Sequence, residues 1–230
     1  MYASLTVVTH PRRRLISALR QARRLAYAAA AAPDIAFARA LQSGTFRPDT
    51  WPAYIPGRVA VMLWAPETEA LATVQETVLA PLAAGATEQW RVVLRAVSIH
   101  GAWAGFSPVS DDVALLRADE PVVVLIHGVL HARYVGKFTR DNAQVGKQLM
   151  QTEGYLGGLA MSDTPLTTAS FSCWRTSRES RSFAFGAGAH RDAYKVDRAE
   201  QRHATEFFVR FRPLHSEGTL AGRDPLAGLL

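Results

Sequence analysis

Apolar and polar positions change their period several times along the second half of the chain. Residues 121–131 form a continuous apolar and β-branched run, which is typical of a buried strand. Residues 132–153 are polar with apolar positions at helical spacing, and Gly154 then supplies a helix stop signal. Two shorter apolar segments, 155–161 and 167–174, predict strands on either side of a turn.

The remaining part of this half completes a known unit. Residues 177–202 are helical in character with an interruption at Gly186 and Gly188, and residues 205–214 predict a last strand. The order is therefore β-α-β-β-α-β, which is the ferredoxin-like unit.

The first half repeats that order. Its segments predict strands at 5–9, 35–41, 59–64 and 91–98, and helices at 13–32 and 67–84. Trp64 and Trp174 each end a strand and enter a helix. The stretch from residue 94 matches the stretch from residue 211, an offset of 117 (211 minus 94). The tryptophans are offset by 110 (174 minus 64), so the second half carries about seven extra residues, which fall around 185–191.

A ferredoxin-like unit has helices on one face of its sheet and needs cover for the other face. We therefore expect an α+β protein in which tandem ferredoxin-like βαββαβ repeats form an intramolecular dimeric α/β-barrel that shields a cavity. The first repeat is expected at 1–105, a linker at 106–120 and the second repeat at 121–230. Residues 47–57, which hold three prolines, predict an irregular loop, and residues 220–230 predict a loose tail.

Composition narrows the class of protein. The chain has 230 residues, of which 48% are hydrophobic and 20% charged, which is enough to bury a core. The one cysteine, Cys173, excludes a disulfide framework and a zinc site of several thiolates. We expect Cys173 to be buried and structural, and we expect a cytoplasmic protein.

No stretch of the sequence reaches the roughly 18 apolar residues of a membrane span. The net charge of +6 comes with no nucleic-acid-binding motif, so we expect a solvated basic surface.

Several segments together resemble a known family. They are Phe171-Ser172-Cys173-Trp174, Phe183-Ala184-Phe185, Ala189-His190-Arg191-Asp192-Ala193, the ending 206–219, and Ser98-Ile99-His100-Gly101-Ala102-Trp103-Ala104-Gly105. This pattern resembles the spheroidene monooxygenase family over nearly the whole chain.

The resemblance implies a tandem dimeric α/β-barrel. The family's namesake oxygenates a carotenoid and is associated with heme, and related barrels include heme-degrading monooxygenases, chlorite dismutases and aldoxime dehydratases. Some heme-degrading members place a helical histidine on the iron, and that position corresponds to His190. The resemblance therefore implies a b-type heme with His190 as the metal ligand and Trp174 beside the cofactor.

His190 is one of seven histidines and the first choice for an axial ligand. It follows Gly-Ala-Gly in the extra segment, on a helix expected to line the barrel mouth. Phe183, Phe185 and Tyr194 lie close in sequence and could wall a porphyrin. The alternative is a partly exposed histidine at a helix start with no ligand role.

Other candidates lie on the predicted strands and helix that flank His190 in the sequence. His127 and His131 are four residues apart, so we expect them on one face of a strand and assign them, with Arg133, catalytic roles. The alternative is that one of the two histidines packs and the other is exposed. Arg133, Lys137 and Arg140 share a helix face that could bind heme propionates or an acidic substrate, or could simply be solvated. His203, at the start of the final strand, is a weaker ligand candidate.

Our preferred hypothesis is a heme-dependent, monooxygenase-like redox enzyme for a small or lipophilic substrate, served by an electron donor. One alternative is a heme lyase resembling aldoxime dehydratase, with a distal histidine as general acid or base. Another is a non-catalytic, ligand-binding barrel. No P-loop, dinucleotide fingerprint or G-x-S-x-G elbow is present. The repeat permits a monomer, and a homodimer is the alternative.

Overall fold

The computed structural model describes residues 1–46, 53–109 and 116–230. The elements of the first half are β1 (Tyr2–Thr9), η1 (Arg12–Arg14), α1 (Leu15–Ala30), β2 (Phe37–Thr45), β3 (Ala53–Ala65), α2 (Thr68–Thr77), η2 (Ala80–Ala83) and β4 (Glu88–Gly101). The helix expected over 67–84 is split, because Pro81 has no N–H to donate within a helix. The expected loop at 47–57 lies partly outside the described residues, and residues 53–57 belong to β3.

The second half repeats this order with one added helix. Its elements are β5 (Val122–Leu130), η3 (Ala132–Tyr134), α3 (Val135–Gln151), β6 (Tyr155–Ser162), β7 (Thr167–Trp174), α4 (Ser177–Phe185), α5 (Ala189–Glu200) and β8 (His203–Gly218). The break at Gly186 and Gly188 separates α4 from α5, as the sequence predicts. The extra length of this half therefore belongs to the connection that includes α5.

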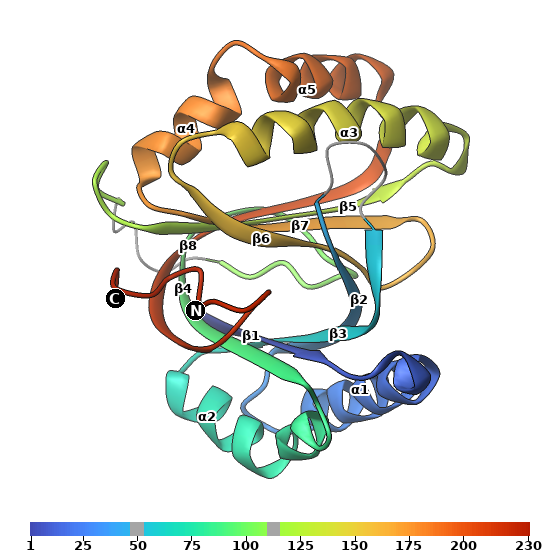
Figure 1. The fold of residues 1–230 in the computed structure, drawn as a ribbon, viewed down its shortest axis with the longest axis vertical. Helices are drawn as coiled ribbons and strands as arrows, with labels where there is room; N and C mark the ends of the chain where they lie inside the picture. Colours follow the sequence, from blue (N-terminus) through green and yellow to red (C-terminus); the bar gives the residue numbers. More distant parts are fainter. Residues whose placement is uncertain (47–52, 110–115) are drawn as a thin grey trace.

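The strands close into one antiparallel barrel in the order β1-β3-β2-β6-β7-β5-β8-β4. The halves join at two seams, where β2 pairs with β6 and β4 pairs with β8. In Figure 1, α1 and α2 lie on one side of the barrel and α3, α4 and α5 on the other. This arrangement confirms the predicted fold class of tandem βαββαβ repeats.

The inner faces of the strands meet in one apolar core. Its bulkiest members are aromatic and come from both halves: Trp64, Trp90, Trp103, Phe171, Phe207 and Phe211. Cys173 is fully buried in the same core, as expected, and burial raises the pKa of its thiol. The expected interior cavity is therefore replaced by side-chain packing.

Two equivalent turns, which we call the end turns, close opposite ends of the β4–β8 pair. The first end turn, residues 101–106, pairs Trp103 with Phe106, and the second, residues 218–223, pairs Leu220 with Arg223. Each contains an alanine in the left-handed region, Ala104 (φ 50°) and Ala221 (φ 56°). The equivalence supports the repeat that the sequence predicts.

The C-terminal segment is docked, so the prediction of a loose tail is wrong. Leu220 and Leu226 are buried in the barrel core. The Asp224 carboxylate accepts hydrogen bonds from the Trp90 indole at 3.0 Å and from the Ser216 hydroxyl at 2.6 Å. A polar anchor among apolar contacts holds this segment on the barrel.

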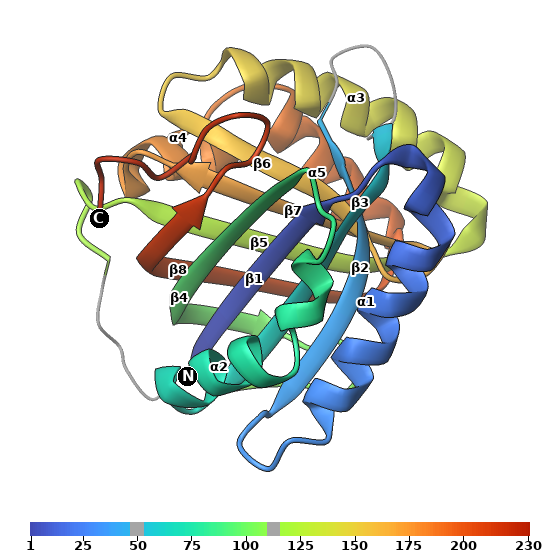
Figure 2. The same ribbon diagram turned by 60° about the horizontal axis from the view of Figure 1, so that its bottom comes forward.

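The helices cover the two halves unequally. Figure 2 shows α1 and α2 lying across the strands of the first half. Five residues of α1 are buried, whereas α5 buries none. None of the described helices is both long enough and apolar enough to cross a membrane.

Candidate functional site

The position of His190 is set by the junction between α4 and α5. Gly188 has φ 144°, and an added Cβ would lie 2.5 Å from the side-chain nitrogen of Gln148 on α3, so this close approach requires glycine. The side-chain oxygen of Gln148 accepts the backbone N–H of His190 at 3.2 Å. A residue of α3 thus satisfies an N–H group in the first turn of α5.

The His190 ring is held in one tautomer and in the neutral form. Its Nδ1 lies 3.1 Å from the carbonyl oxygen of Ala184, so Nδ1 carries the proton and donates it. Burial lowers the pKa of His190, which the hydrogen bond to Ala184 offsets only in part. Nε2 therefore keeps its lone pair, and no described residue donates a hydrogen bond to it. This is the state in which imidazole binds a metal.

Aromatic rings connect His190 to the outer face of the second-half sheet. The ring of His190 lies 4.8 Å from that of Phe183, and Phe183 lies 5.2 Å from Trp174. Trp174 in turn contacts Tyr155 at 5.6 Å and donates its indole N–H to Ser172 at 2.9 Å. The histidine is thus positioned by a packed aromatic cluster between helix and strand.

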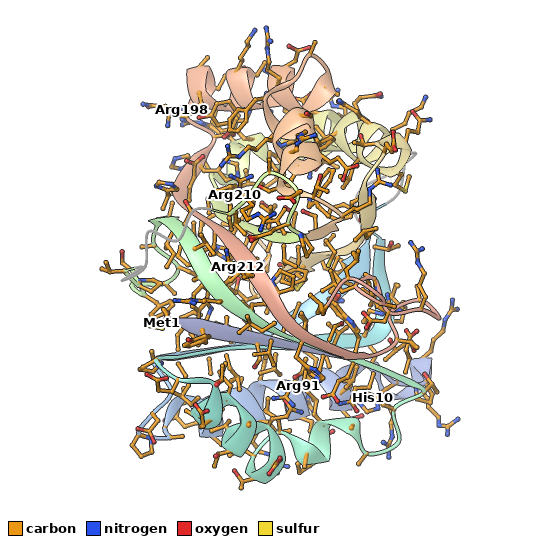
Figure 3. The ribbon with its side chains drawn as sticks, turned by 90° about the vertical axis from the view of Figure 1, so that its left-hand side faces the viewer. Met1, His10, Arg91, Arg198, Arg210 and Arg212 are labelled. Atoms are coloured by element: carbon orange, nitrogen blue, oxygen red, sulfur yellow. The ribbon has the colours of Figure 1, made fainter. Side chains whose placement is uncertain are left out.

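The sheet beneath these helices is only partly covered. Its outward positions on β7 are the half-buried Ser170 and Ser172, and Ile126 on β5 is 38% exposed. Arg210 lies on β8 between Arg212 and the helix layer (Figure 3). We call this surface the second-half sheet face.

Arg210 has no carboxylate partner among the described residues. Its guanidinium makes a 3.5 Å contact with the Ser177 hydroxyl, and burial together with the charge of Arg181 lowers its pKa. Arg212 lies two residues further along the same face of β8, and its guanidinium pairs with the carboxylate of Glu120 at 2.9 Å. An unpaired, half-buried guanidinium can receive a carboxylate from a ligand.

His127 lies on the other side of the sheet, in the barrel core. It is 2% exposed, and its Nε2 is 3.4 Å from an oxygen of Asp163. Trp103 stacks on the His127 ring at 4.4 Å and donates its indole N–H to Asp163 at 3.1 Å. Burial raises the pKa of Asp163, but hydrogen bonds from His127, Thr167 and Trp103 outweigh it, so the pKa is below its usual range. Asp163 is thus an ionised, partly buried hydrogen-bond acceptor.

The expectation that His131 shares a face with His127 is wrong. β5 ends at Leu130, and His131 lies beyond it as an exposed residue whose backbone N–H donates to Arg202 at 2.9 Å. The strand alternation therefore stops before it can bring the second imidazole to the core. The expected position of His190 at the barrel mouth also differs, because α5 lies in the outer helix layer (Figure 1).

Two known proteins are similar to this chain in sequence. No family model matches it. A spheroidene monooxygenase of Rhodobacter capsulatus is 29% identical over 175 residues, which cover 74% of this chain and 73% of that protein. The chain is a homologue of the spheroidene monooxygenases. A second one, from Cereibacter sphaeroides, is 26% identical over 147 residues, which cover 63% of this chain and 45% of that protein.

Solved structures agree with the fold of this spheroidene monooxygenase homologue. An aldoxime dehydratase crystallised with butyraldoxime has a TM-score of 0.60 at 10% identity, covering 99% of this chain and 84% of that one. Another aldoxime dehydratase has a TM-score of 0.54 at 12% identity, covering 92% and 80%. At such identities the likeness concerns the fold alone.

The predicted site residues of this chain do not lie together. Trp174 lies in the aromatic cluster of His190, and His127 lies on the opposite side of the sheet. The other predicted residues lie towards solvent. Phe185 is 73% and Tyr194 55% exposed, Lys137 is paired with Glu200, and the Arg133 guanidinium lies 4.9 Å from the centre of the Tyr134 ring.

Two residues near these sites, Asp163 and Arg210, carry no recognisable signal in a sequence motif. Asp163 lies in a predicted turn, and Arg210 is one of 26 basic residues on a chain whose charge we expected to be solvated. Alternation along the last strand could have found Arg210, because it lies between the inward Val209 and Phe211 and must face the helices.

Proposed function

We propose that this chain is a heme-dependent monooxygenase that oxygenates a lipophilic small molecule. The support from sequence is its homology to proteins named spheroidene monooxygenase, and spheroidene is lipophilic. The observation that carries the proposal is the state of His190. Its Nδ1–H donates a hydrogen bond to the carbonyl oxygen of Ala184, and burial favours the neutral ring. The lone pair of Nε2 is therefore available to a metal.

The residues around His190 fit a b-type heme. His190 would hold the iron through Nε2, and the cluster of Phe183 and Trp174 would restrict the imidazole orientation. Arg210, which lacks a carboxylate partner among the described residues, would pair with a propionate. Heme, when bound, supplies the activation of dioxygen.

The second-half sheet face supports the proposed substrate class. Ile126 is 38% exposed beside the partly buried Phe208, so an apolar molecule bound there would remove apolar surface from water. Incorporation of one oxygen atom into a C–H bond consumes dioxygen, two electrons and two protons, and releases water. The electrons require a donor separate from this chain. The single, buried Cys173 supports a cytoplasmic setting.

The first experiment titrates hemin into the purified full chain and follows the Soret band. We expect stoichiometric binding to the wild type and loss of the imidazole-ligated spectrum in His190→Ala. His131→Ala is the matched control, since His131 is exposed and no ring contact joins it to the described cluster of His190. A His190→Ala spectrum identical to that of the wild type would remove His190 from the iron.

The second experiment supplies the loaded protein with a carotenoid, a reductant and isotopically labelled dioxygen. We expect a product that carries one labelled oxygen atom, and none without reductant. Turnover of an aldoxime in the absence of reductant would instead identify a lyase, and a chain that binds no heme at all would refute the cofactor assignment.

A further inference from the structure

A group of side chains of the types that bind metals lies where α5 runs into β8. Gln201 adopts a left-handed conformation (φ 50°) and reverses the chain. This turn brings Asp197, in the last turn of α5, next to His203, the first residue of β8. Glu206 follows three residues later, and one ligand atom from each of the three lies within 4.8 Å of the other two.

The spacing of these atoms is close to that of a coordination shell. His203 Nδ1 lies 3.0 Å from Asp197 Oδ1 and 3.7 Å from Glu206 Oε1. Ligands at the usual zinc distances in a tetrahedral site lie about 3.3 Å apart. The two distances from His203 therefore differ from the tetrahedral value by a few tenths of an ångström, and the carboxylate of the exposed Glu206 can move to complete the set.

Asp197 has an acceptor that the protein does not use. Both of its oxygens lie 3.0 Å from His203 Nδ1, whose single N–H donates to Oδ2, so the buried Oδ1 accepts no hydrogen bond. A buried carboxylate oxygen without a donor is costly, and a cation would satisfy it.

The His203 ring is fixed with Nδ1 towards the two carboxylates. A Cβ on Gly128 would lie 2.4 Å from the ring carbon Cδ2, so glycine at that position allows the ring to sit against β5. Phe138 of α3 contacts the ring edge-on at 5.3 Å and 90°. This packing limits the rotation of the ligand before any metal arrives, which lowers the entropy lost on binding.

The surroundings of these three side chains are accessible, and the exposed Arg198 lines them beside the carboxylates. Asp197, Gln201, His203 and Glu206 line a surface hollow of about 390 Å³. The carbonyl end of α5 adds partial negative charge. Arg202, which also lines the hollow, donates to Asp141 and to Glu200 at 2.7 Å each, so its charge is offset by other carboxylates.

We infer that Asp197, His203 and Glu206 bind a divalent metal ion of the zinc class, at a site separate from His190. The metal replaces the Nδ1 proton of His203, which moves to Nε2 or is released to water. One imidazole nitrogen with two carboxylates suits zinc and neighbouring transition metals better than magnesium or calcium, which prefer oxygen alone. Three protein ligands leave a fourth position to solvent, and Glu206, whose side chain is 52% exposed, lies on that open side.

The test uses the full chain, stripped of metal with a chelator and titrated with Zn²⁺ and, separately, with Mg²⁺ by calorimetry. We expect one Zn²⁺ per chain and no comparable binding of Mg²⁺. Cobalt substitution should give the visible absorption of a tetrahedral site. Glu206→Gln, at an exposed position, keeps the fold and should weaken Zn²⁺ binding by more than about tenfold, and Asp197→Asn by more.

His215→Gln is the matched control, because His215 lies 3.7 Å from Glu217 as an exposed pair on the same strand. Its Zn²⁺ affinity should equal that of the wild type. Unchanged affinity in both Glu206→Gln and Asp197→Asn would overturn the proposal, as would a loss in His215→Gln or equal affinity for Mg²⁺. Zn²⁺ binding should be retained in His190→Ala, which would show that the zinc site does not depend on the proposed heme ligand.

Discussion

The two halves share one topology but cover their outward sheet faces differently. In the first half, Val59, Val61 and Leu63 on β3 are fully buried beneath the helices, and α1 contributes five buried residues. In the second half, α5 has no buried residue, and α3 buries only Gly146 and Leu149. The sheet face below them has partly exposed serines and Ile126 instead of a dry layer.

This difference teaches how a duplicated fold can separate stability from binding. A dry helix–sheet layer gains free energy from every apolar group that it removes from water. A half-covered face gives up part of that gain and keeps polar and aromatic groups accessible to a ligand. His190, Arg210 and the Asp197–His203–Glu206 group all lie in the second half. We expect the first half to stabilise the barrel and the second half to bind.

The largest expected effect concerns the end turns. Trp103 is 1% exposed, so Trp103→Ala should lower the free energy of unfolding by about 3–5 kcal/mol, because it opens a large gap and takes a donor from Asp163. Leu220→Ala, at the equivalent position of the second end turn, should cost about 2 kcal/mol. Urea denaturation measures both, and equal losses would argue against an energetic difference between the ends.

The next effect compares the helix layers directly. Leu71 on α2 is fully buried, so Leu71→Ala should cost about 2–4 kcal/mol. Val196 on α5 is 36% exposed, so Val196→Ala should cost less than about 0.5 kcal/mol. Hydrogen exchange on the same samples should show faster opening of α5 than of α1. Similar costs and similar protection would remove the contrast between the layers.

A smaller effect is expected at Arg210, where one substitution should raise the stability of the ligand-free protein and lower its affinity for hemin. Arg210→Met keeps the aliphatic stem but removes a half-buried charge without a carboxylate partner, so the ligand-free protein should gain up to about 1 kcal/mol. Hemin affinity should fall, because a propionate would lose its cation. Arg212→Met serves as the control, since Arg212 is paired with Glu120 and should lose rather than gain stability. A destabilised Arg210→Met would show that its charge is compensated.

The smallest effect is the pH dependence contributed by His190. Burial lowers its pKa in the folded state below that in the unfolded chain. The unfolded chain therefore binds more protons below a pH of about 6.5, and stability falls as the pH decreases from there. Denaturation midpoints between pH 7 and pH 5 should decrease more in the wild type than in His190→Gln. Parallel curves would place the imidazole in water-like surroundings.

Much of the fold could be predicted because it depends on local pattern. The Gly186 and Gly188 break, the buried run at 121–131 and the matching tryptophans are all visible in the chain, and each corresponds to a feature of the barrel. The C-terminal tail could not be predicted in the same way. Its docking depends on Asp224 meeting Trp90, and no periodicity within residues 220–230 indicates a partner that distant in sequence.

The sequence by itself determined the repeat and the order of strands and helices, because strand alternation, helical spacing and glycine breaks are properties of neighbouring residues. His190 as the candidate ligand rests on the resemblance to the spheroidene monooxygenase family. Only the tertiary structure decided which side of the sheet each histidine faces. It separated His127 from His190 by a layer of strands, left Arg210 without a carboxylate partner among the described residues and brought His203 to Asp197. Such relations depend on strand ends, bulges and closure of the barrel, which join residues far apart in the chain.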